Sequence, residues 1–305
     1  MEYRDQAVRG AWRVRARLRM ARLVAAVMLV APSAHAFCRA MTCGKKCPMD
    51  PDTGCPMGTP IRWPQLCVSY SMQRDASIQV DLETATDLVG QAFTSWEDVT
   101  CPEGGKPSIR TSNPFGTVVC KEHEYNQLDG NANIILFHDE PWSHEDVEDA
   151  LAVTTVTFNK RTGDILDADM ELDSQIHLSL DAASDPTGYD LPSLLAHETG
   201  HFLGLAHSPD PDATMWFSYE PDARFLSADD VAGICAIYPP SAASSECDYT
   251  PRQGFSPECG IYPSTGCSVA RSLGSGGARD PRWAPIAVLL SAWIVRVSAR
   301  RRTRR

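Results

Sequence analysis

The sequence lacks an apolar run long enough to cross a bilayer as a helix. Its apolar stretches near the two ends, Leu23–Ala31 and Trp283–Val295, fall short of the ~20 residues that a spanning helix needs. It also has no internal repeat. Over 305 residues, 43% hydrophobic and 22% charged residues are typical of a folded protein with a substantial core, and they exclude a polytopic membrane protein.

Positive charge is scarce between the two ends. Residues 37–267 hold 12 Lys and Arg against 36 Asp and Glu, a net charge of −24, whereas the whole chain carries −11. An acidic surface repels phosphate groups, so we expect no nucleic-acid partner. This balance suits a soluble exported protein or one that binds cations.

The N-terminal end has the pattern of a signal peptide. Arg-rich sequence precedes the apolar run Leu23–Ala31, and the small-x-small triplet Ala34-His35-Ala36 follows it. We therefore expect residues 1–36 to be removed after Ala36 and the protein to be exported, either secreted or held at the cell surface. An N-terminal membrane helix is the alternative.

The C-terminal end, residues 267–305, combines a Gly-Cys motif at Cys267, a short apolar segment and a basic terminus. The apolar segment would cover about 20 Å as a helix, well short of a ~30 Å hydrocarbon core. This layout resembles the C-terminal sorting tails of myxobacterial surface proteins, a resemblance that implies modification of Cys267, removal of the tail and membrane contact through the tail alone. A weak membrane helix held by its Arg cluster is the alternative.

The chain has eleven cysteines, an odd number. If Cys267 belongs to the tail, ten remain, and an exported protein is expected to pair them in five disulfides. Their connectivity stays open, because ten cysteines allow about 945 pairings. A zinc site in the cluster Cys38–Cys55 is the competing interpretation. The ten cysteines are Cys38, Cys43, Cys47, Cys55, Cys67, Cys101, Cys120, Cys235, Cys247 and Cys259.

Between the ends we predict a Cys-rich N-terminal arm (37–60), one domain (61–240) and a Cys-containing linker (241–266). Helical spacing and capping residues predict helices, and short β-branched or apolar runs predict strands. The predicted helices are Val80–Val99, Leu191–Leu205 and Ala228–Tyr238. The predicted strands are Gln65–Ser71, Ser108–Thr111, Asn133–His138 and a hairpin of Leu151–Phe158 with Asp164–Asp173, which turns at Gly163.

The second arm of this hairpin alternates acidic and apolar residues. Alternation on a strand gives one face to each set, so we expect a wet acidic face and a core face. The acidic face offers oxygen ligands suited to Ca²⁺, and a solvated strand face explains the pattern as well. Its members are Asp167, Asp169, Glu171 and Asp173.

The segment His197–His207 carries the strongest chemical signal in the sequence. His197 and His201 lie four residues apart, so on a helix both imidazoles can reach one zinc ion. Gly204 can adopt positive φ and end the helix, which brings His207 to the same ion. Three protein ligands leave the fourth position open, as in a catalytic zinc site. Glu198 lies beside them, where it is placed to act as general base on a zinc-activated water.

This motif, H-E-x-x-H-x-x-G-x-x-H, is that of the metzincins, and Met215 stands where their Met-turn belongs. Within the metzincins the chain resembles a matrixin, the matrix metalloproteinase family. Ser208 follows the third histidine, Val153–Asp173 resembles the family's fourth and fifth strands, and Leu226–Ile234 resembles its last helix. The resemblance covers about residues 61–239.

The resemblance implies an α+β fold of the zincin type: a twisted, mostly parallel five-stranded sheet with an antiparallel edge strand, an active-site helix and a C-terminal helix. It implies that the edge strand pairs with an extended peptide substrate, and that residues after Met215 wall the pocket for the residue beyond the scissile bond. The implied substrate-binding residues are Leu151, Ala152, Val153, Thr154, Thr155, Trp216, Phe217, Ser218 and Tyr219.

Two features of the family have no counterpart in the sequence. No stretch matches its structural-zinc loop, so we expect one catalytic zinc and no second zinc, and no cysteine-switch prodomain precedes the domain. Cys47 or Cys55 could reach the zinc as a latency ligand, but disulfide pairing is the competing role. The other histidines lack metal spacing and are expected to be surface or satisfied residues: His123, His138, His144 and His177.

Taken together, the sequence predicts a monomeric, secreted or surface-displayed zinc metalloendopeptidase with peptide or protein substrates. The alternative is a non-catalytic surface module that retains zinc and binds a protein or matrix partner. Glu198 favours catalysis, because a structural zinc site has no chemical need for this carboxylate.

Overall fold

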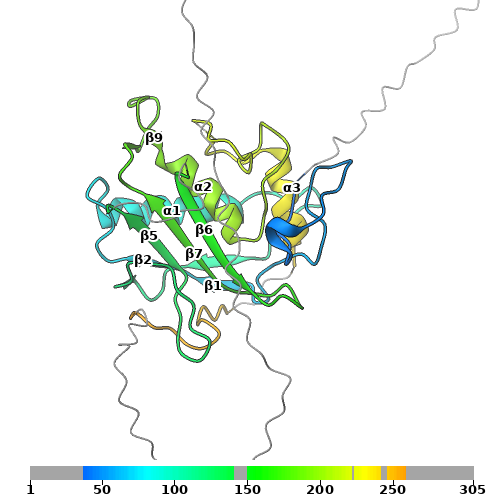
Figure 1. Cartoon of the computed structure of the whole chain (residues 1–305), viewed down its shortest axis with the longest axis horizontal. Helices are drawn as coiled ribbons and strands as arrows, with labels where there is room; N and C mark the ends of the chain where they lie inside the picture. The colour runs from blue at the N-terminus through cyan, green and yellow to red at the C-terminus, as the bar shows by residue number, and fades with distance from the viewer. Residues whose placement is uncertain (1–36, 141–149, 222, 242–245, 259–305) are drawn as a thin grey trace, which may run out of the picture. The chain divides into compact units, whose positions relative to one another are not determined.

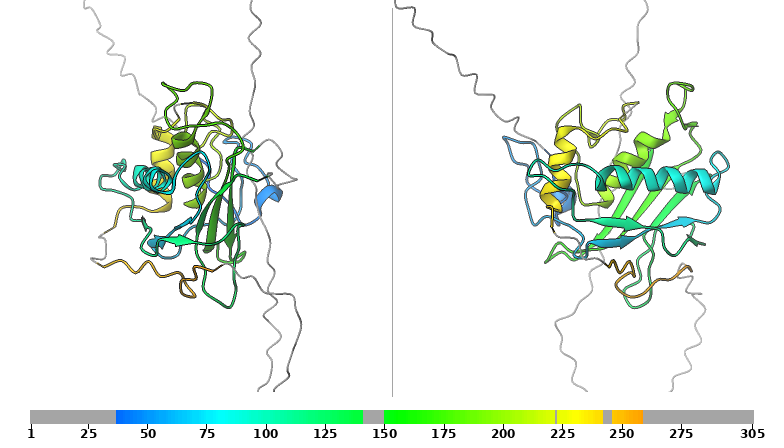
Figure 2. Two further views of the ribbon diagram at one scale, coloured as in Figure 1. Left: turned by 90° about the vertical axis from the view of Figure 1, so that its left-hand side faces the viewer. Right: turned by 180° about the vertical axis from the view of Figure 1, so that it is seen from behind.

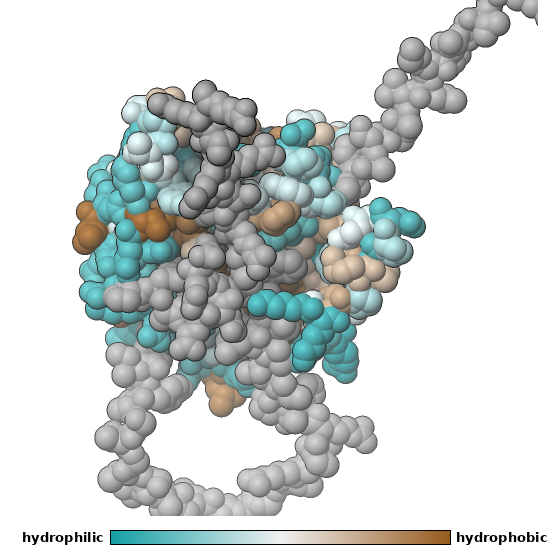
Figure 3. All heavy atoms as spheres, turned by 45° about the horizontal axis from the view of Figure 1, so that its top comes forward, coloured by the Kyte–Doolittle hydropathy of each residue, from teal (hydrophilic) through white to brown (hydrophobic). Residues whose placement is uncertain are grey.

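The structure is a computed structural model that describes residues 37–140, 150–221, 223–241 and 246–258 (Figure 1). The predicted signal peptide, the C-terminal tail with Cys267, and His144 lie outside these residues. Within the described ranges, no helix is long and apolar enough to span a membrane. On the face shown in Figure 3, the described surface is mainly hydrophilic, with hydrophobic side chains in small separate groups.

A five-stranded sheet forms the centre of the domain, in the order β4-β2-β5-β7-β6. The first four strands run parallel, and β6 pairs antiparallel with β7 at one edge. The predicted α+β fold with an antiparallel edge strand is confirmed. The strands are β4 (Thr117–Val118), β2 (Ser71–Gln73), β5 (Ile134–His138), β7 (Ile165–Asp173) and β6 (Ala152–Phe158).

The three α-helices of the described residues lie on one side of the sheet, as the edge-on view in the left panel of Figure 2 shows. Each begins at a side chain that accepts a backbone N–H of its first turn: Asp81, Asp190 and Ser227. Such caps satisfy donors that have no partner inside the helix. The helices are α1 (Leu82–Glu97), α2 (Leu191–Phe202) and α3 (Ala228–Ile237), which confirms the three predicted helices with slightly trimmed ends.

The predicted strand Gln65–Ser71 is divided in two. It forms β1 (Cys67–Ser69), which pairs with β3 (Arg110–Ser112) in a separate small sheet, and β2, which joins the central sheet. The division falls at Tyr70, whose ring stacks on Phe93 of α1 with centroids 4.5 Å apart. A second two-stranded sheet, β8 (Leu178–Ser179) with β9 (Tyr189–Asp190), leads into α2 and was not predicted.

We expected the acidic face of β7 to be exposed to solvent, and this expectation is wrong, because Asp167, Asp169 and Glu171 are buried. The segment 121–133 covers this side of the sheet, and residues 254–256 run beside it through backbone hydrogen bonds to Asn131. Asp169 accepts backbone N–H groups of Glu124 (2.8 Å) and Ile134 (2.7 Å). The alternating pattern correctly indicated that these acidic residues share one face of β7. That face is buried because segment 121–133 lies over it, so it is not in contact with solvent.

Glu171 lies between two histidines expected to be surface or satisfied residues. His123 Nδ1 and His138 Nε2 are each 2.9 Å from one of its carboxylate oxygens. Both rings are largely covered, so these histidines are satisfied residues of a buried cluster and do not lie free on the surface.

Disulfides close loops within the arm and attach the linker to the domain. In the arm, Cys38 pairs with Cys55 and Cys43 with Cys47, beside a short 3-10 turn, η1 (Gly44–Lys46). The alternatives of a zinc site in this arm and of a latency role for Cys47 or Cys55 are therefore wrong. Two further disulfides, Cys67–Cys247 and Cys101–Cys235, cross the domain, and Cys120 is disulfide-bonded as well.

Candidate active site

The structure brings the three predicted histidines together. His197 and His201 lie one turn apart on α2, and His207 follows after the helix has ended. Their ring centroids are 4.8 to 5.2 Å apart, and one nitrogen from each ring lies within 4.8 Å of the other two. Three imidazole nitrogens at this spacing could hold one metal ion.

Gly204 makes the turn that delivers the third histidine. Its φ of +97° is in the region that favours glycine, and a Cβ there would lie 3.1 Å from the carbonyl oxygen of Ile61. The N-terminal arm supports the segment from its other side: Ala40 N–H donates to Gly204 O (3.0 Å), and Ala206 N–H donates to Cys38 O (2.9 Å). The arm and the turn therefore fix the backbone that leads to His207.

Backbone carbonyls set the tautomers of the two helical histidines. His197 Nδ1 donates to Thr214 O at 2.7 Å, and His201 Nδ1 donates to Leu205 O at 3.0 Å. Because a carbonyl only accepts, each Nδ1 carries the proton and each Nε2 keeps its lone pair. His197 Nε2 is buried and has no hydrogen-bond partner among the described residues.

Burial keeps the three imidazoles neutral. It lowers the pKa of His197 to about 4 and that of His201 to about 3, and it holds the pKa of His207 well below its ordinary value. A neutral imidazole is the form that binds a metal ion. The donor set therefore fits a zinc ion, as its spacing predicted.

Glu198 is 1% exposed and lies on the same helix. Its Oε2 accepts a hydrogen bond of 2.6 Å from the hydroxyl of Thr154, a residue of β6. Its Oε1 is buried and has no hydrogen-bond partner in the described part of the chain. Burial raises the pKa of Glu198 to about 7, and the hydrogen bond from Thr154 opposes that rise.

Met215 packs directly beneath α2 at Gly200. A Cβ at Gly200 would overlap Met215 Sδ and would lie 2.9 Å from Trp96 Cζ2. The turn around Met215 is anchored to α3, because Asp230 accepts the N–H groups of Thr214 (2.7 Å) and Met215 (3.1 Å). Asp230 also belongs to the cap of α3, where its carboxylate accepts the N–H of Ser227 (2.8 Å), and no local pattern in the sequence marks its second role at Met215.

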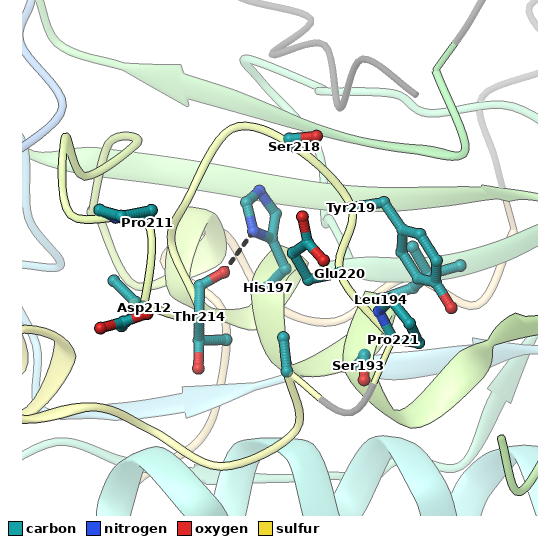
Figure 4. Close-up of a pocket in the computed structure, with 12 residues that line it drawn as sticks. Ser193, Leu194, His197, Pro211, Asp212, Thr214, Ser218, Tyr219, Glu220 and Pro221 are labelled. Carbon is teal, nitrogen blue, oxygen red and sulfur yellow. Dashed lines mark hydrogen bonds between the residues drawn. The ribbon is translucent and has the colours of Figure 1, made fainter. Parts of the chain in front are cut away.

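A cavity of about 440 Å³ opens beside His197 (Figure 4). Of the predicted wall residues, Ser218 and Tyr219 line it, together with Leu194 and Pro221. Trp216 and Phe217 are not among its lining residues, and their rings pack against each other with centroids 4.2 Å apart. The Tyr219 hydroxyl accepts the N–H of Asp190, which ties this wall to the start of α2.

The predicted substrate strand forms the sheet edge nearest the site. β6 pairs with β7 on one side, and no other strand of the described ranges pairs with it. Of its predicted substrate-binding residues, Leu151 precedes the strand, while Ala152, Val153, Thr154 and Thr155 lie within it.

Comparisons with known proteins find similar sequences among matrix metalloproteinases. Human matrix metalloproteinase-20 is 50% identical over 56 residues, bovine interstitial collagenase 54% over 55 residues, and rat stromelysin-1 40% over 93 residues. These matches cover 17%, 17% and 29% of this chain, and the chain spans only 12%, 12% and 19% of the respective relatives. The family model for matrixin matches residues 62–239, more than half of the sequence. The chain belongs to the matrixin family.

Proposed function

We propose that the protein is a zinc-dependent endopeptidase that hydrolyses peptide bonds in proteins. The observation that carries the proposal is the meeting of three neutral imidazoles with a buried carboxylate in a matrixin domain. His197, His201 and the buried Glu198 lie on α2, and His207 joins them from the turn after the helix. The relatives named as a metalloproteinase and a collagenase support the same reaction class. A non-catalytic zinc-containing module, the alternative from the sequence, has no observation in its favour.

His197, His201 and His207 would hold the single zinc ion. When bound, the ion acts as a Lewis acid that polarises the attacking water and the scissile carbonyl. The protein's part is to present one nitrogen lone pair from each of the three rings. The carbonyls of Thr214 and Leu205 do this by holding two of the rings through Nδ1.

Glu198 would act as general base and then as general acid. Its Oε1 would accept the proton of the attacking water and return it to the leaving amine. Removal of this carboxylate leaves the three imidazoles in place. Loss of Glu198 is therefore expected to abolish cleavage without abolishing metal binding.

The substrate would lie extended along β6, with its backbone paired to the edge of that strand that faces away from β7. The residue after the scissile bond would enter the cavity beside His197, which Ser218 and Tyr219 line. Met215 would support α2 from below. Trp216 and Phe217 lie in the segment that leads to this wall.

We also propose that the protein is exported, acts as a monomer, and is displayed through modification of Cys267. The disulfides fit an oxidising compartment. Calcium stays a proposal for the buried face of β7, where Asp167 Oδ1 has no hydrogen-bond partner among the described residues. Carboxylate oxygens are the ligands that Ca²⁺ prefers.

The experiment uses three forms of the protein, each produced in an oxidising compartment. For each form we would measure the zinc bound per chain and the rate at which it cleaves a denatured protein substrate. The three forms are the wild type, Glu198→Ala and, as a control, Glu83→Ala, which removes an exposed carboxylate from the first turn of α1. We expect one zinc per chain in all three and cleavage lost only in Glu198→Ala. One zinc without cleavage by the wild type would support the binding module, and no zinc in a folded product would overturn the site.

A further inference from the structure

Thr154 connects the edge strand to the carboxylate of α2. It lies in β6 opposite Met170 of β7 and is 1% exposed. Its hydroxyl donates to Glu198 Oε2 at 2.6 Å and lies 3.3 Å from the backbone oxygen of Glu198. The two residues are 44 positions apart in the sequence, so this contact exists only because the fold lays α2 across β6.

The hydroxyl of Thr154 is a polar group on a face of β6 whose neighbouring residues, Ala152 and Val156, are apolar. Alternation places Ala152, Thr154 and Val156 on the same side of β6, and all three are buried. A hydroxyl in such a row costs free energy unless it is hydrogen-bonded. Valine has nearly the same shape and would fill the position without that cost, so the hydroxyl itself requires an explanation.

The contact makes the two oxygens of Glu198 unequal. Oε2 accepts the hydroxyl, whereas Oε1 is buried and accepts no hydrogen bond from the described residues. A carboxylate with one anchored oxygen loses its freedom to rotate, and the second oxygen keeps a fixed direction. This is how a neighbouring side chain orients a general base.

We infer that Thr154 is a positioning residue for Glu198: its hydroxyl anchors Oε2 and leaves Oε1 as the oxygen that receives the proton. The inference rests on the proposed endopeptidase function. It also gives β6 two tasks, because the backbone that would pair with the substrate carries the side chain that orients the base. Substrate and general base are then positioned by the same strand.

The test compares four forms of the full chain: wild type, T154V, T154S and T117V. T154V keeps the branched shape and removes the hydroxyl, T154S keeps the hydroxyl, and T117V makes the same change in β4 at the opposite edge of the sheet. The measurements are kcat and KM on a peptide substrate, zinc per chain, Tm, and the conformation of Glu198 in crystal structures of the variants.

We expect T154V to lower kcat about ten- to a hundredfold, the size of effect that follows from a misplaced catalytic group. KM and zinc content should stay near the wild-type values, and the Glu198 carboxylate should be rotated. T154S should keep the carboxylate in place and recover most of kcat, and T117V should match the wild type. A purely structural role would lower Tm and would leave kcat per folded molecule unchanged.

Equal kcat for wild type and T154V, or the same loss in T154S as in T154V, would overturn the role of Thr154. Zinc-loaded wild type without cleavage would overturn the proposed function itself, so the two failures are distinguishable. If T154V does not fold, T154A replaces it in the same comparison with T154S.

Discussion

Gly200 and Met215 are in direct contact, because the absence of a side chain at Gly200 lets the Met215 sulfur lie against α2. Gly200→Ala would force the sulfur or the helix to move. Overpacking of this kind costs about 1–3 kcal/mol. We expect a lower Tm and weaker zinc binding, measured by thermal unfolding and by competition with a chromophoric chelator.

Gly90 provides the matched control, since it lies inside α1 and a Cβ there would meet only Tyr70 OH, at 3.6 Å. Alanine in a helix interior is favoured over glycine by roughly 0.5–1 kcal/mol. Gly90→Ala should therefore raise Tm while Gly200→Ala lowers it. A rise in both would mean that Met215 adapts without cost.

Removal of the Cys38–Cys55 disulfide is expected to weaken zinc binding. Cys38 O and Ala40 N–H hold the backbone at Gly204 and Ala206, just before His207. Without the disulfide this part of the arm can separate from the turn. The measurement is zinc affinity of the double variant Cys38→Ser/Cys55→Ser.

The second disulfide of the arm is the control. Cys43–Cys47 closes a loop with a sequence separation of only 4, against 17 for Cys38–Cys55, so its loss frees less chain. Cys43→Ser/Cys47→Ser should bind zinc nearly as the wild type does. Equal zinc affinities for the two double variants would show that the arm does not support the site.

The buried acidic cluster predicts a stability that falls as pH rises. Burial raises the pKa of Asp169 to about 8 and raises that of Asp167 as well, with Glu124, Glu171 and His123 facing the pair. The unfolded chain releases these protons near pH 4. Between these values the folded state holds more protons, so the free energy of unfolding decreases toward pH 8, by up to about 1.4 kcal/mol per pH unit for each proton.

Calcium at this cluster would reverse that trend, because it binds the ionised carboxylates. We expect added Ca²⁺ to raise Tm more at pH 8 than at pH 5, and Asp167→Asn to remove most of this shift. Asp173→Asn, at the more exposed end of the same strand, should keep it. If added Ca²⁺ leaves Tm unchanged at both pH values, the calcium site would be ruled out.

The site was more predictable than the surroundings that support it. His197 and His201 share one face of a single helix, and His207 follows one turn after it. Sequence patterns over a few residues were therefore sufficient to predict that the three side chains meet. The burial of Asp167 depends on segment 121–133, and the partner of Thr154 lies 44 residues away. Periodicity shows which residues share a face, but not what covers that face.

The division at Tyr70 has the same cause. A run of strand-forming residues does not specify its partners, and here β1 and β2 pair in different sheets. The disulfide connectivity was likewise open in the sequence, because cysteines as distant as Cys67 and Cys247 are joined only by the fold.

The backbone bonds between the arm and the turn at Gly204 bear on proteolytic maturation. An inhibitory prosegment can be cut away because the enzyme beneath it is complete. Residues 38–40, by contrast, are paired with the chain that leads to His207. Trimming them would leave the Gly204 carbonyl and the Ala206 amide without their partners, so a protease that shortened this end would damage the metal site.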